Sequence, residues 1–249
     1  MAFTNVTFRR GACVVLDDVT FAIAPGEFVG IIGGNGAGKS TLLHLALGLL
    51  APSEGTVRIF AGDPRRKHRP LGYVPQRIEL ARDVPLRARD FVALGVDGER
   101  FGLPLPNRAR AQRVEVALRD VGALALADKP VGRLSGGEQQ RLAIAQAVVG
   151  EPALLLLDEP LANLDLGSAV DVVTLVRRIA QERGMTVLLV AHDVNPLMRA
   201  IDRVLYLANG RAALGTVDHI INEDVLSRLY DRPVDVVRVR GRIIVVAGT

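Results

Sequence analysis

The chain has 249 residues, of which 49% are hydrophobic and 23% charged, and this composition excludes a disordered chain or a collagen-like fibre. The length suits one large domain, or one domain that carries a small insertion. A net charge of +4 is compatible with binding to nucleic acid, anionic lipid or nucleotide phosphate. Most arginines stand beside acidic residues, however, and the densest basic run, at 65–69, is flanked by prolines and predicts a solvated loop. We therefore expect no nucleic-acid partner.

The cysteine count and the apolar runs exclude further classes of protein. A single cysteine, Cys13, rules out a disulfide framework and a cysteine-based zinc site, and it fits the reducing cytoplasm. The N-terminus shows no secretory signal. The densest apolar run, at 153–157, is far shorter than the roughly 20 residues of a membrane-spanning helix. The apolar excess therefore predicts buried strands or a surface that meets a partner.

Residues 1–75 contain short runs with high strand propensity. Turn residues such as Pro25 and Gly26 separate these runs. The predicted strands are Phe3–Phe8, Val19–Ala24, Glu27–Ile32 and Thr56–Phe60.

Residues 76–147 predict helices instead. A stretch rich in proline and glycine, at 80–106, predicts a mobile connection with a short helix near Arg87–Leu94. Apolar residues at helical spacing then predict an amphipathic helix over Arg108–Val121.

From residue 148 onward, predicted strands and helices alternate. Apolar strands are expected at Ala153–Leu157, Thr186–Val190 and Val204–Leu207, and an amphipathic helix at Ser168–Glu182. Such alternation favours a parallel sheet covered by helices on both faces, so the predicted fold class is α/β. The last segment, Val234–Val246, alternates around a turn and predicts a β-hairpin.

The most specific motif is a glycine-rich run that matches G-x-x-x-x-G-K-[ST] in full. An apolar strand precedes this run and an apolar helix, at Thr41–Leu50, follows it, which is the context that the motif requires. The residues of the run and the start of the helix are Gly33, Gly34, Asn35, Gly36, Ala37, Gly38, Lys39, Ser40 and Thr41.

This run predicts a site for a nucleoside triphosphate. Glycines let backbone N–H groups converge on the phosphates, and the following helix presents its positive N-terminal end. We expect Lys39 to reach the β- and γ-phosphates and the Ser40 hydroxyl to ligate Mg²⁺.

Two carboxylates, Asp158 and Glu159, end the apolar run at 154–157. Side chains at the tip of a buried strand in an open α/β sheet point toward the crevice where ligands bind. We expect Asp158 to hold Mg²⁺ through water and Glu159 to polarise an attacking water. The alternative is that the pair caps a helix.

A second polar run opens the predicted helix at Glu138–Val149, and its residues are Ser135, Gly136, Gly137 and Glu138. A hydroxyl, bare backbone N–H groups and a helix N-terminus together predict a second anion site. With the phosphate loop and the carboxylate pair, this run makes the chain resemble the ATP-binding subunit of an ABC transporter over nearly its whole length. The family usually has glutamine where this chain has Glu138.

The resemblance implies a P-loop ATPase with a RecA-like, mostly parallel sheet. It also implies an ATPase core with an N-terminal antiparallel β subdomain at 1–75 and 148–215, an inserted α-helical subdomain at 76–147, and C-terminal helices with a β-hairpin at 216–249. In this family the run that corresponds to Ser135–Glu138 is the signature run, and the glycine-rich run at 33–40 is the phosphate loop. The signature run of one copy covers the ATP that the phosphate loop of another copy holds. A homodimer is therefore expected on ATP binding.

Four further residues receive roles from the resemblance. Gln76 matches the glutamine that links Mg²⁺ and the attacking water to the helical subdomain, and His192 matches the histidine that contacts the γ-phosphate. Asp165 is expected to help join the two copies or to cap the helix that follows it, and both can hold. Arg10 stands where the family often has an aromatic residue against adenine, and its guanidinium either stacks on the base or points into solvent.

The resemblance also implies ATP hydrolysis with Mg²⁺ that powers transport, on the cytoplasmic, inner face of the cell membrane. The permease is then a separate integral-membrane protein, because no apolar run of this chain spans a bilayer. The segments at 73–92 and 191–230 are similar to subunits of zinc, manganese and iron importers, which work with a metal-capturing solute-binding protein.

Other functions stay open at this stage. One is the ATPase subunit of a siderophore importer or of an exporter for a drug, lipid or peptide. Another is a soluble ABC ATPase of DNA repair or translation. The short spacing between Gln76 and Asp158 leaves no room for the coiled-coil arm that is typical of the last class.

Overall fold

The computed structural model describes residues 1–60, 62–64, 71–76, 84–97, 107–162 and 164–247. The chain forms two compact units, one made of residues 1–69 and 186–249 and the other of residues 70–185. The basic run at 65–69, and residues 80–83 and 98–106 of the predicted connection, lie outside the described residues.

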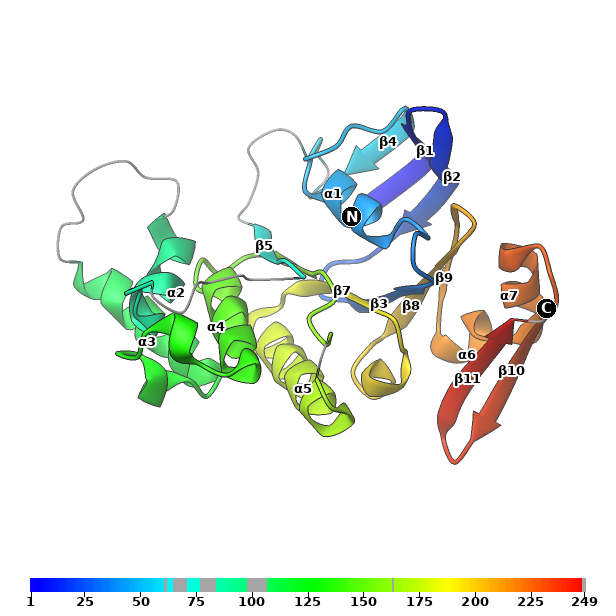
Figure 1. The fold of residues 1–249 in the computed structure, drawn as a ribbon. Coiled ribbons are helices and arrows are strands. Elements are labelled where there is room, and N and C mark those ends of the chain that lie inside the picture. The colour runs from blue at the N-terminus through cyan, green and yellow to red at the C-terminus, as the bar shows by residue number, and fades with distance from the viewer. Residues whose placement is uncertain (61, 65–70, 77–83, 98–106, 163, 248–249) are drawn as a thin grey trace. The chain divides into compact units, whose positions relative to one another are not determined.

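The first unit begins with an antiparallel sheet of three strands (Figure 1). The strands are β1 (Ala2–Arg10), β2 (Cys13–Ala22) and β4 (Glu54–Arg58), with β1 in the centre. Phe3 and Phe21 pair across β1 and β2, and their rings stack with centroids 4.7 Å apart. This sheet confirms the antiparallel strands predicted near the N-terminus.

A second sheet of the same unit has parallel strands at its centre. Strand β3 (Phe28–Gly33) lies between β7 (Thr186–Ala191) and β8 (Arg203–Ala208) and runs parallel to both. Strand β9 (Arg211–Gly215) pairs antiparallel with β8. All residues of β3 and β7 are buried, as a strand covered on both faces requires. Helix α1 (Lys39–Ala46) follows β3.

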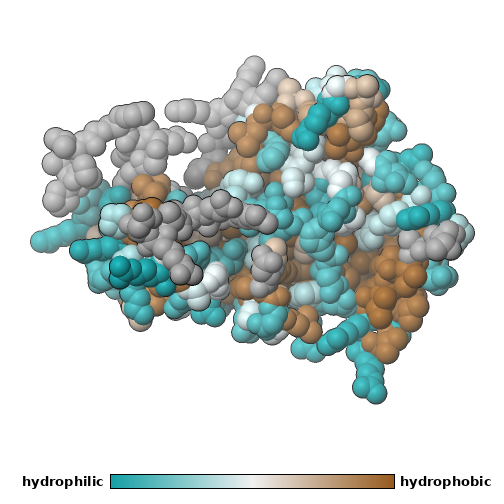
Figure 2. All heavy atoms as spheres, in the orientation of Figure 1, coloured by the Kyte–Doolittle hydropathy of each residue, from teal (hydrophilic) through white to brown (hydrophobic). Residues whose placement is uncertain are grey.

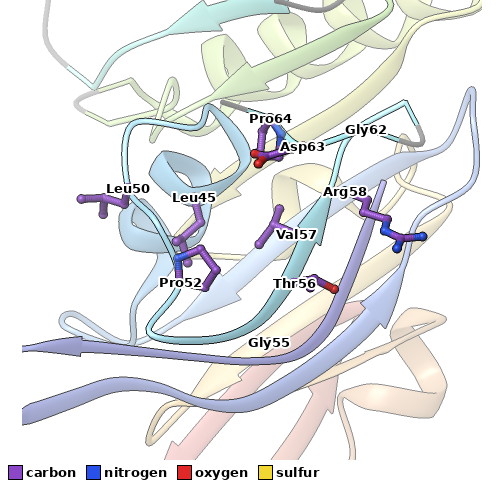
Figure 3. Close-up of a pocket in the computed structure, with 10 residues that line it drawn as sticks. All are labelled: Leu45, Leu50, Pro52, Gly55, Thr56, Val57, Arg58, Gly62, Asp63 and Pro64. Carbon is purple, nitrogen blue, oxygen red and sulfur yellow. The ribbon is translucent and has the colours of Figure 1, made fainter. Parts of the chain in front are cut away.

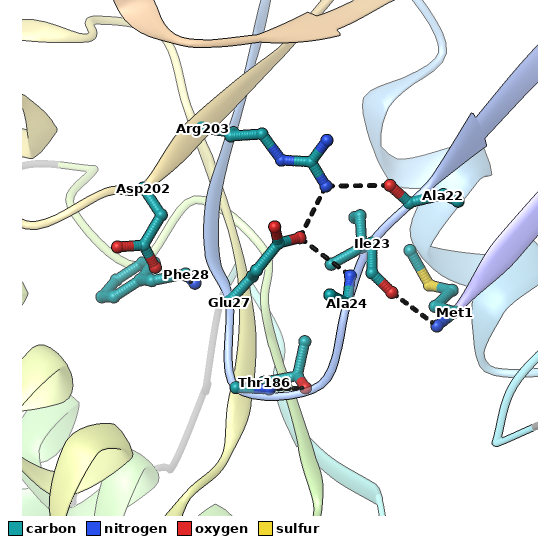
Figure 4. Close-up of polar contacts among 10 residues, drawn as sticks. Met1, Ala22, Ile23, Ala24, Glu27, Phe28, Thr186, Asp202 and Arg203 are labelled. Carbon is teal, nitrogen blue, oxygen red and sulfur yellow. Dashed lines mark hydrogen bonds and ion pairs between the residues drawn. The ribbon is translucent and has the colours of Figure 1, made fainter.

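A polar network holds the starts of these parallel strands together (Figure 4). Glu27, which directly precedes β3, forms an ion pair of 2.6 Å with Arg203, the first residue of β8. Asp202 accepts a hydrogen bond of 2.8 Å from the N–H of Phe28, and Thr186 accepts one from the turn before β3. These contacts fix the register of three strands whose side chains are otherwise apolar.

The C-terminal part of the first unit is a pair of short helices and a hairpin. These are α6 (Val217–Ile220), α7 (Glu223–Tyr230), β10 (Val234–Val239) and β11 (Arg242–Ala247). The two strands join through Arg240 and Gly241, which both have positive φ, at 48° and 76°. A two-residue turn of this kind matches the twist of the strands, and it confirms the hairpin that the sequence predicted.

The described residues of the second unit form two parallel strands and four α-helices. Strands β5 (Leu71–Val74) and β6 (Leu154–Leu157) pair in register. The helices are α2 (Ala88–Asp97), α3 (Arg108–Asp120), α4 (Gly136–Val148) and α5 (Leu166–Arg183). Helices α2, α3 and α4 pack on one another.

The C-terminal end of α4 is fixed by close backbone contacts. A side chain at Gly95 of α2 would overlap the carbonyl oxygen of Gln146, and one at Gly72 of β5 would lie 2.6 Å from the carbonyl oxygen of Ala147. Arg183 of α5 donates a hydrogen bond of 2.8 Å to the carbonyl oxygen of Val148. Helix α2, strand β5 and helix α5 therefore all contact the last turn of α4.

The structure confirms the predicted α/β class and corrects several local expectations. Strand β2 begins at Cys13 rather than Val19 and continues through two exposed aspartates, because its register with β1 shifts there. Helix α1 ends at Ala46 rather than Leu50, because Gly48 adopts a φ of 72° that stops the helix. Strands β5 and β9 were not predicted. Among the described residues, no helix is both long and apolar enough to cross a membrane.

Candidate active site

The glycine-rich run forms a tight turn between β3 and α1. Gly33 ends β3, and a side chain there would overlap the backbone carbonyl of Leu207 on β8. Gly38 has a φ of 99°, and a side chain there would lie 2.8 Å from the side chain of Leu16. These two glycines are needed to make the turn.

Two other glycines of the run, Gly34 and Gly36, adjoin open space. Side chains at Gly34 or Gly36 would meet no atom within 4 Å. Helix α1 starts directly after Gly38, with no side-chain hydrogen bond that caps its N-terminus. Backbone N–H groups at an uncapped helix start, beside open space, suit an anion, and the binding of phosphate here stays a prediction.

Lys39 brings a positive charge to this helix start. Its side chain is only 5% exposed, and its Nζ donates hydrogen bonds of 2.9 Å to the carbonyl oxygens of Gly33 and Gly34. The ammonium group is thus folded over the loop itself. The half-buried Ser40 follows in the first turn of α1 and Thr41 lies buried behind it.

His192 lies at the same edge of the sheet as the phosphate loop. It follows the last residue of β7, and that residue, Ala191, pairs with Ile32 of β3. The carboxyl ends of these parallel strands therefore present His192 and Gly33 side by side, and the His192 side chain is exposed. Within the first unit, the structure brings together the predicted phosphate loop and the predicted histidine.

The carboxylate pair directly follows β6 in the second unit, beside the end of β5. Val74 pairs with Leu157, and the N–H of Asp158 donates a hydrogen bond of 2.9 Å to the carbonyl oxygen of Val74. Asp158 is 5% exposed. Burial, and secondly the negative charge of Asp158, raise the pKa of Tyr73.

Gln76 and Glu159 are in direct contact. The Nε2 atom of Gln76 donates a hydrogen bond of 2.6 Å to Oε2 of Glu159, across 83 positions of sequence. Glu159 has a φ of 49°, a left-handed conformation that costs energy for a residue with a side chain. Sequence reasoning expected both residues in the site but did not predict either their contact or this conformation, because both depend on the pairing of β5 with β6.

The signature run caps the start of α4. The backbone N–H and the Oγ of Ser135 both donate hydrogen bonds of 2.8 Å to Oε2 of Glu138, and the N–H of Glu138 donates back to the Ser135 Oγ. This reciprocal pair is a capping box. The backbone and side-chain hydrogen bonds from Ser135 lower the pKa of Glu138.

Asp165 and Arg10 have simpler surroundings. Asp165 caps α5 by accepting hydrogen bonds from the Oγ of Ser168 at 2.6 Å and from its N–H at 3.0 Å, and these bonds lower the pKa of Asp165. The predicted capping role is thus confirmed. Arg10 is exposed at the end of β1, opposite Cys13. Its contact with a base stays a prediction.

A separate pocket of about 390 Å³ lies in the first unit (Figure 3). It is bounded by Leu45 of α1, by Val57 and Arg58 of β4, and by the segment at 62–64. The residues that line it include none of those predicted to bind the nucleotide, so the phosphate loop and not this pocket is the candidate site.

Comparison with known proteins assigns the chain to a family. The family model described as ABC transporter matches residues 16–162, a range that includes the phosphate loop, the signature run and the carboxylate pair. The chain belongs to the ABC transporter family. It is an ATP-binding subunit of that family and therefore an ATPase that powers transport.

Three of the similar curated ABC subunits are named for the import or transport of hemin, zinc or metal. The chain is 37% identical to the hemin import ATP-binding protein of Bordetella pertussis, over 98% of this chain and 97% of the other. It is 38% identical to the zinc import ATP-binding protein of Cereibacter sphaeroides, over 92% and 88%. It is 35% identical to a probable metal transport system ATP-binding protein of Thermotoga maritima, over 89% and 86%.

Solved ABC structures share the fold. An ABC transporter described as of the metal-chelate type, in an inward-facing conformation, has a TM-score of 0.82 at 26% identity, over 100% of this chain and 97% of the other. A dimeric bacterial ABC transporter cassette has a TM-score of 0.73 at 30% identity, over 87% and 98%. A cassette dimer bound to ADP and phosphate has a TM-score of 0.72 at 29% identity, over 87% and 98%.

Proposed function

We propose that this subunit hydrolyses ATP between two copies of the chain and that the cycle drives import of a metal ion or a metal complex through a separate permease. The observation that carries the catalytic part is the hydrogen bond between Gln76 and Glu159 at the ends of β5 and β6. The names of the similar proteins, which import hemin, zinc or metal, support the transport part.

The phosphate loop of the first unit holds the triphosphate in this proposal. The open surface over Gly34 and Gly36 and the uncapped start of α1 supply backbone N–H groups for the phosphate oxygens. On binding, the Lys39 ammonium exchanges the carbonyl oxygens of the loop for phosphate oxygens, which form stronger charge-assisted hydrogen bonds. Arg10 lies over the adenine, and His192 contacts the γ-phosphate.

The oxygen donors of the chain suit Mg²⁺, which prefers hard oxygen ligands. The Ser40 hydroxyl, the nearly buried Asp158 carboxylate and the Gln76 amide would hold the ion, with Asp158 acting through water. Bound there, Mg²⁺ supplies neutralisation of the charge that develops on the phosphates.

Glu159 acts on water. Its Oε2 already accepts a hydrogen bond from the Gln76 amide, which fixes the carboxylate, while its other oxygen can accept a proton from the attacking water. Phosphoryl transfer asks mainly for positioning and charge neutralisation, so a carboxylate held in one orientation is a sufficient catalytic device.

The second copy closes the site through its signature run, Ser135 to Gly137, while Asp165 at the start of α5 helps to join the two copies. The dimeric cassettes among the similar solved structures support this arrangement. Together with a permease, and with a solute-binding protein that captures the metal, the pair of subunits would lie on the cytoplasmic face of the cell membrane.

The catalytic assignment is tested by Glu159→Gln. This change keeps the shape of the side chain but removes the base, so hydrolysis should fall roughly 10²–10⁴-fold, while ATP still binds and the ATP-bound dimer accumulates. Turnover is measured by phosphate release and dimerisation by size-exclusion chromatography. Glu182→Gln, at an exposed position on α5, is the matched control and should change neither. Near-normal turnover of Glu159→Gln would remove Glu159 from its role.

The transport assignment is tested in cells that lack this chain. We expect them to lose uptake of a metal ion or of hemin, and we expect the reconstituted transporter to show ATPase activity that a loaded binding protein stimulates. The purified subunit should respond to zinc or manganese only as substitutes for Mg²⁺. Normal uptake of metal ions, hemin and iron siderophores, with loss of drug export, would contradict the substrate and leave the ATPase assignment intact.

A further inference from the structure

The C-terminal hairpin presents an apolar face to solvent. Side chains alternate along β10 and β11, so the register places residues 235, 237 and 239 on one face with residues 242, 244 and 246. On this outer face Val237 is 45% exposed, Val239 50%, Ile244 50% and Val246 48%. Val237 and Ile244 pair with each other in the middle of this face. Val239 lies near the turn on β10, and Val246 lies near the open end on β11.

The hairpin is firmly docked by its other side. Val234 and Ile243 on the inner face are buried. On the outward edge of β10, the N–H of Val234 donates a hydrogen bond of 3.0 Å to the Oγ of Ser227 in α7. On the edge of β11, the Asn195 side chain forms two hydrogen bonds with the backbone of Ile243. Its Oδ1 accepts one of 2.8 Å from the N–H, and its Nδ2 donates one of 2.9 Å to the carbonyl oxygen. The exposed face is therefore held in place, unlike a loose tail.

Apolar exposure is concentrated on this face. Among the described residues, twelve large apolar side chains are exposed, and four of them are on the outer face of the hairpin. Figure 2 shows the apolar side chains gathered over β10 and β11. The hairpin also lies outside residues 16–162, which the family model matches. Contiguous apolar surface of this kind marks an interaction site.

Two charges indicate which partner fits. Asp235 and Arg242 are the two charged residues of the outer face, they lie at opposite corners of it, and the described contacts give neither an ion-pair partner. With strands about 5 Å apart and a rise of about 3.4 Å per residue, the line from Asp235 to Arg242 is inclined by roughly 20° to the strands. The face thus carries one charge of each sign, placed symmetrically about an apolar centre.

A face with this arrangement is complementary to itself. Consider a two-fold axis that lies in the plane of contact and is perpendicular to the line from Asp235 to Arg242. This axis places each Asp235 opposite Arg242 of the second copy. It also stacks Val237 on Val237 and Ile244 on Ile244 of the second copy. The two hairpins then cross at roughly 40°, which lies near the roughly 30° at which aligned sheets pack.

We propose that two copies of this chain associate through the outer faces of their C-terminal hairpins, with or without nucleotide. Two short strands cover far less than the roughly 800 Å² per partner of a standard interface, so the contact is weak and reversible, and is populated at high protein concentration. It is separate from the ATP-dependent contact of the proposed function, and neither requires the other.

The first test is sedimentation equilibrium of the nucleotide-free protein at up to several hundred micromolar. We expect self-association, and Val237→Lys should abolish it because the lysine would be buried against its own counterpart. Leu49→Lys is the matched control, since Leu49 is 68% exposed on the same unit but away from the hairpin, and it should associate like the parent chain. Circular dichroism confirms that both variants are folded. A parent chain that stays monomeric throughout would overturn the proposal.

The second test uses the charges. Asp235→Arg alone, or Arg242→Asp alone, places like charges opposite each other and should weaken association about tenfold, whereas the double variant should restore it. A double variant that is no better than the single ones would overturn the two-fold arrangement.

The third test distinguishes a second copy from another partner. Corner residues of one hairpin are roughly 14 Å apart, so a short bis-maleimide cannot join them within one chain, whereas opposed corners of two copies are within its reach. In a Cys13→Ser background, Asp235→Cys with Arg242→Cys should give cross-linked dimers. Cross-linking only to a permease in the assembled transporter, and never between two copies, would overturn the proposal.

Discussion

Two helices of this protein start with a glycine-rich run, yet their first turns are built in opposite ways. Helix α1 has Gly38 at its N-cap, in a left-handed conformation and without a side-chain cap. Helix α4 has Ser135 at its N-cap and a complete capping box with Glu138. One helix start is therefore left without a side-chain cap, while at the other the side chains of Ser135 and Glu138 satisfy two backbone N–H groups.

The difference separates a permanent site from a conditional one. If phosphate binds at α1 as proposed, the hydrogen bonds from Lys39 to the loop are the ones that must be exchanged. At α4 the Ser135 hydroxyl donates a hydrogen bond to Glu138, so it must turn away from that carboxylate before it can donate one to a phosphate. A signature run that closes over nucleotide only in the dimer suits the second design.

The largest effect that tests this comparison is expected at Gly38. Gly38→Ala forces a side chain into a φ of 99° and against Leu16, so it should lower the free energy of unfolding by about 1–3 kcal/mol and abolish nucleotide binding. Gly34→Ala is the control, because its side chain enters open space: it should leave stability within about 0.5 kcal/mol of the parent and weaken only nucleotide binding. Urea unfolding and nucleotide titration measure the two quantities. Equal stability of Gly38→Ala and the parent chain would contradict the argument.

A smaller effect is expected at the capped helix. Ser135→Ala removes the acceptor for the N–H of Glu138 and should cost about 0.5–2 kcal/mol of stability, again by urea unfolding. Ser135→Thr retains the hydroxyl and should lose less. If alanine and threonine were equivalent, the capping box would have no energetic role.

The base end of the α1 site provides a third test. If Arg10 stacks on adenine, Arg10→Ala should weaken ATP binding by about 0.5–2 kcal/mol, and Arg10→Tyr should largely restore it. Calorimetric titration of the monomer measures this. Unchanged affinity in both variants would identify Arg10 as a solvated surface residue.

The smallest effect is a pH dependence at α4. The hydrogen bonds from Ser135 lower the pKa of Glu138 below its ordinary value of 4.5, so the folded protein binds this proton more weakly than the unfolded chain. The stabilisation is therefore complete above pH 4.5 and is lost as the pH falls through the lowered value. Glu138→Gln should flatten this part of the profile of unfolding free energy against pH. A profile that is unchanged by the substitution would show that the carboxylate contributes nothing.

Local patterns of the sequence predicted most of the fold. The long amphipathic helices and the buried strands were found because their periodicity is strong, and the phosphate loop because its motif is continuous. Strand β5 was missed because it has only four residues, one of them glycine. Strand β9 was missed because alanine and glycine are poor strand formers, although Asn209-Gly210, with φ values of 47° and 76°, is a hairpin signal that could have revealed it.

The site was predicted residue by residue but not in its contacts. Motifs name Gln76 and Glu159 separately, whereas their hydrogen bond exists only because β5 pairs with β6. The same holds for the exposed face of the hairpin: alternation predicted the strands, but only the register and the packing of the other face decide which valines stay in water. Long-range pairing is the information that a local pattern lacks.

Helix α4 is held at its C-terminal turn by α2, β5 and α5, so a tilt about that end would move its N-terminal end the most. Its 13 residues span roughly 20 Å, so a tilt of about 10° at the held end moves Ser135 by roughly 3 Å, about the length of one hydrogen bond. The held end touches β5, the strand that leads to Gln76. A tilt of α4 would therefore connect the position of the signature run to β5, the strand that leads to Gln76 and, through its hydrogen bond, to Glu159.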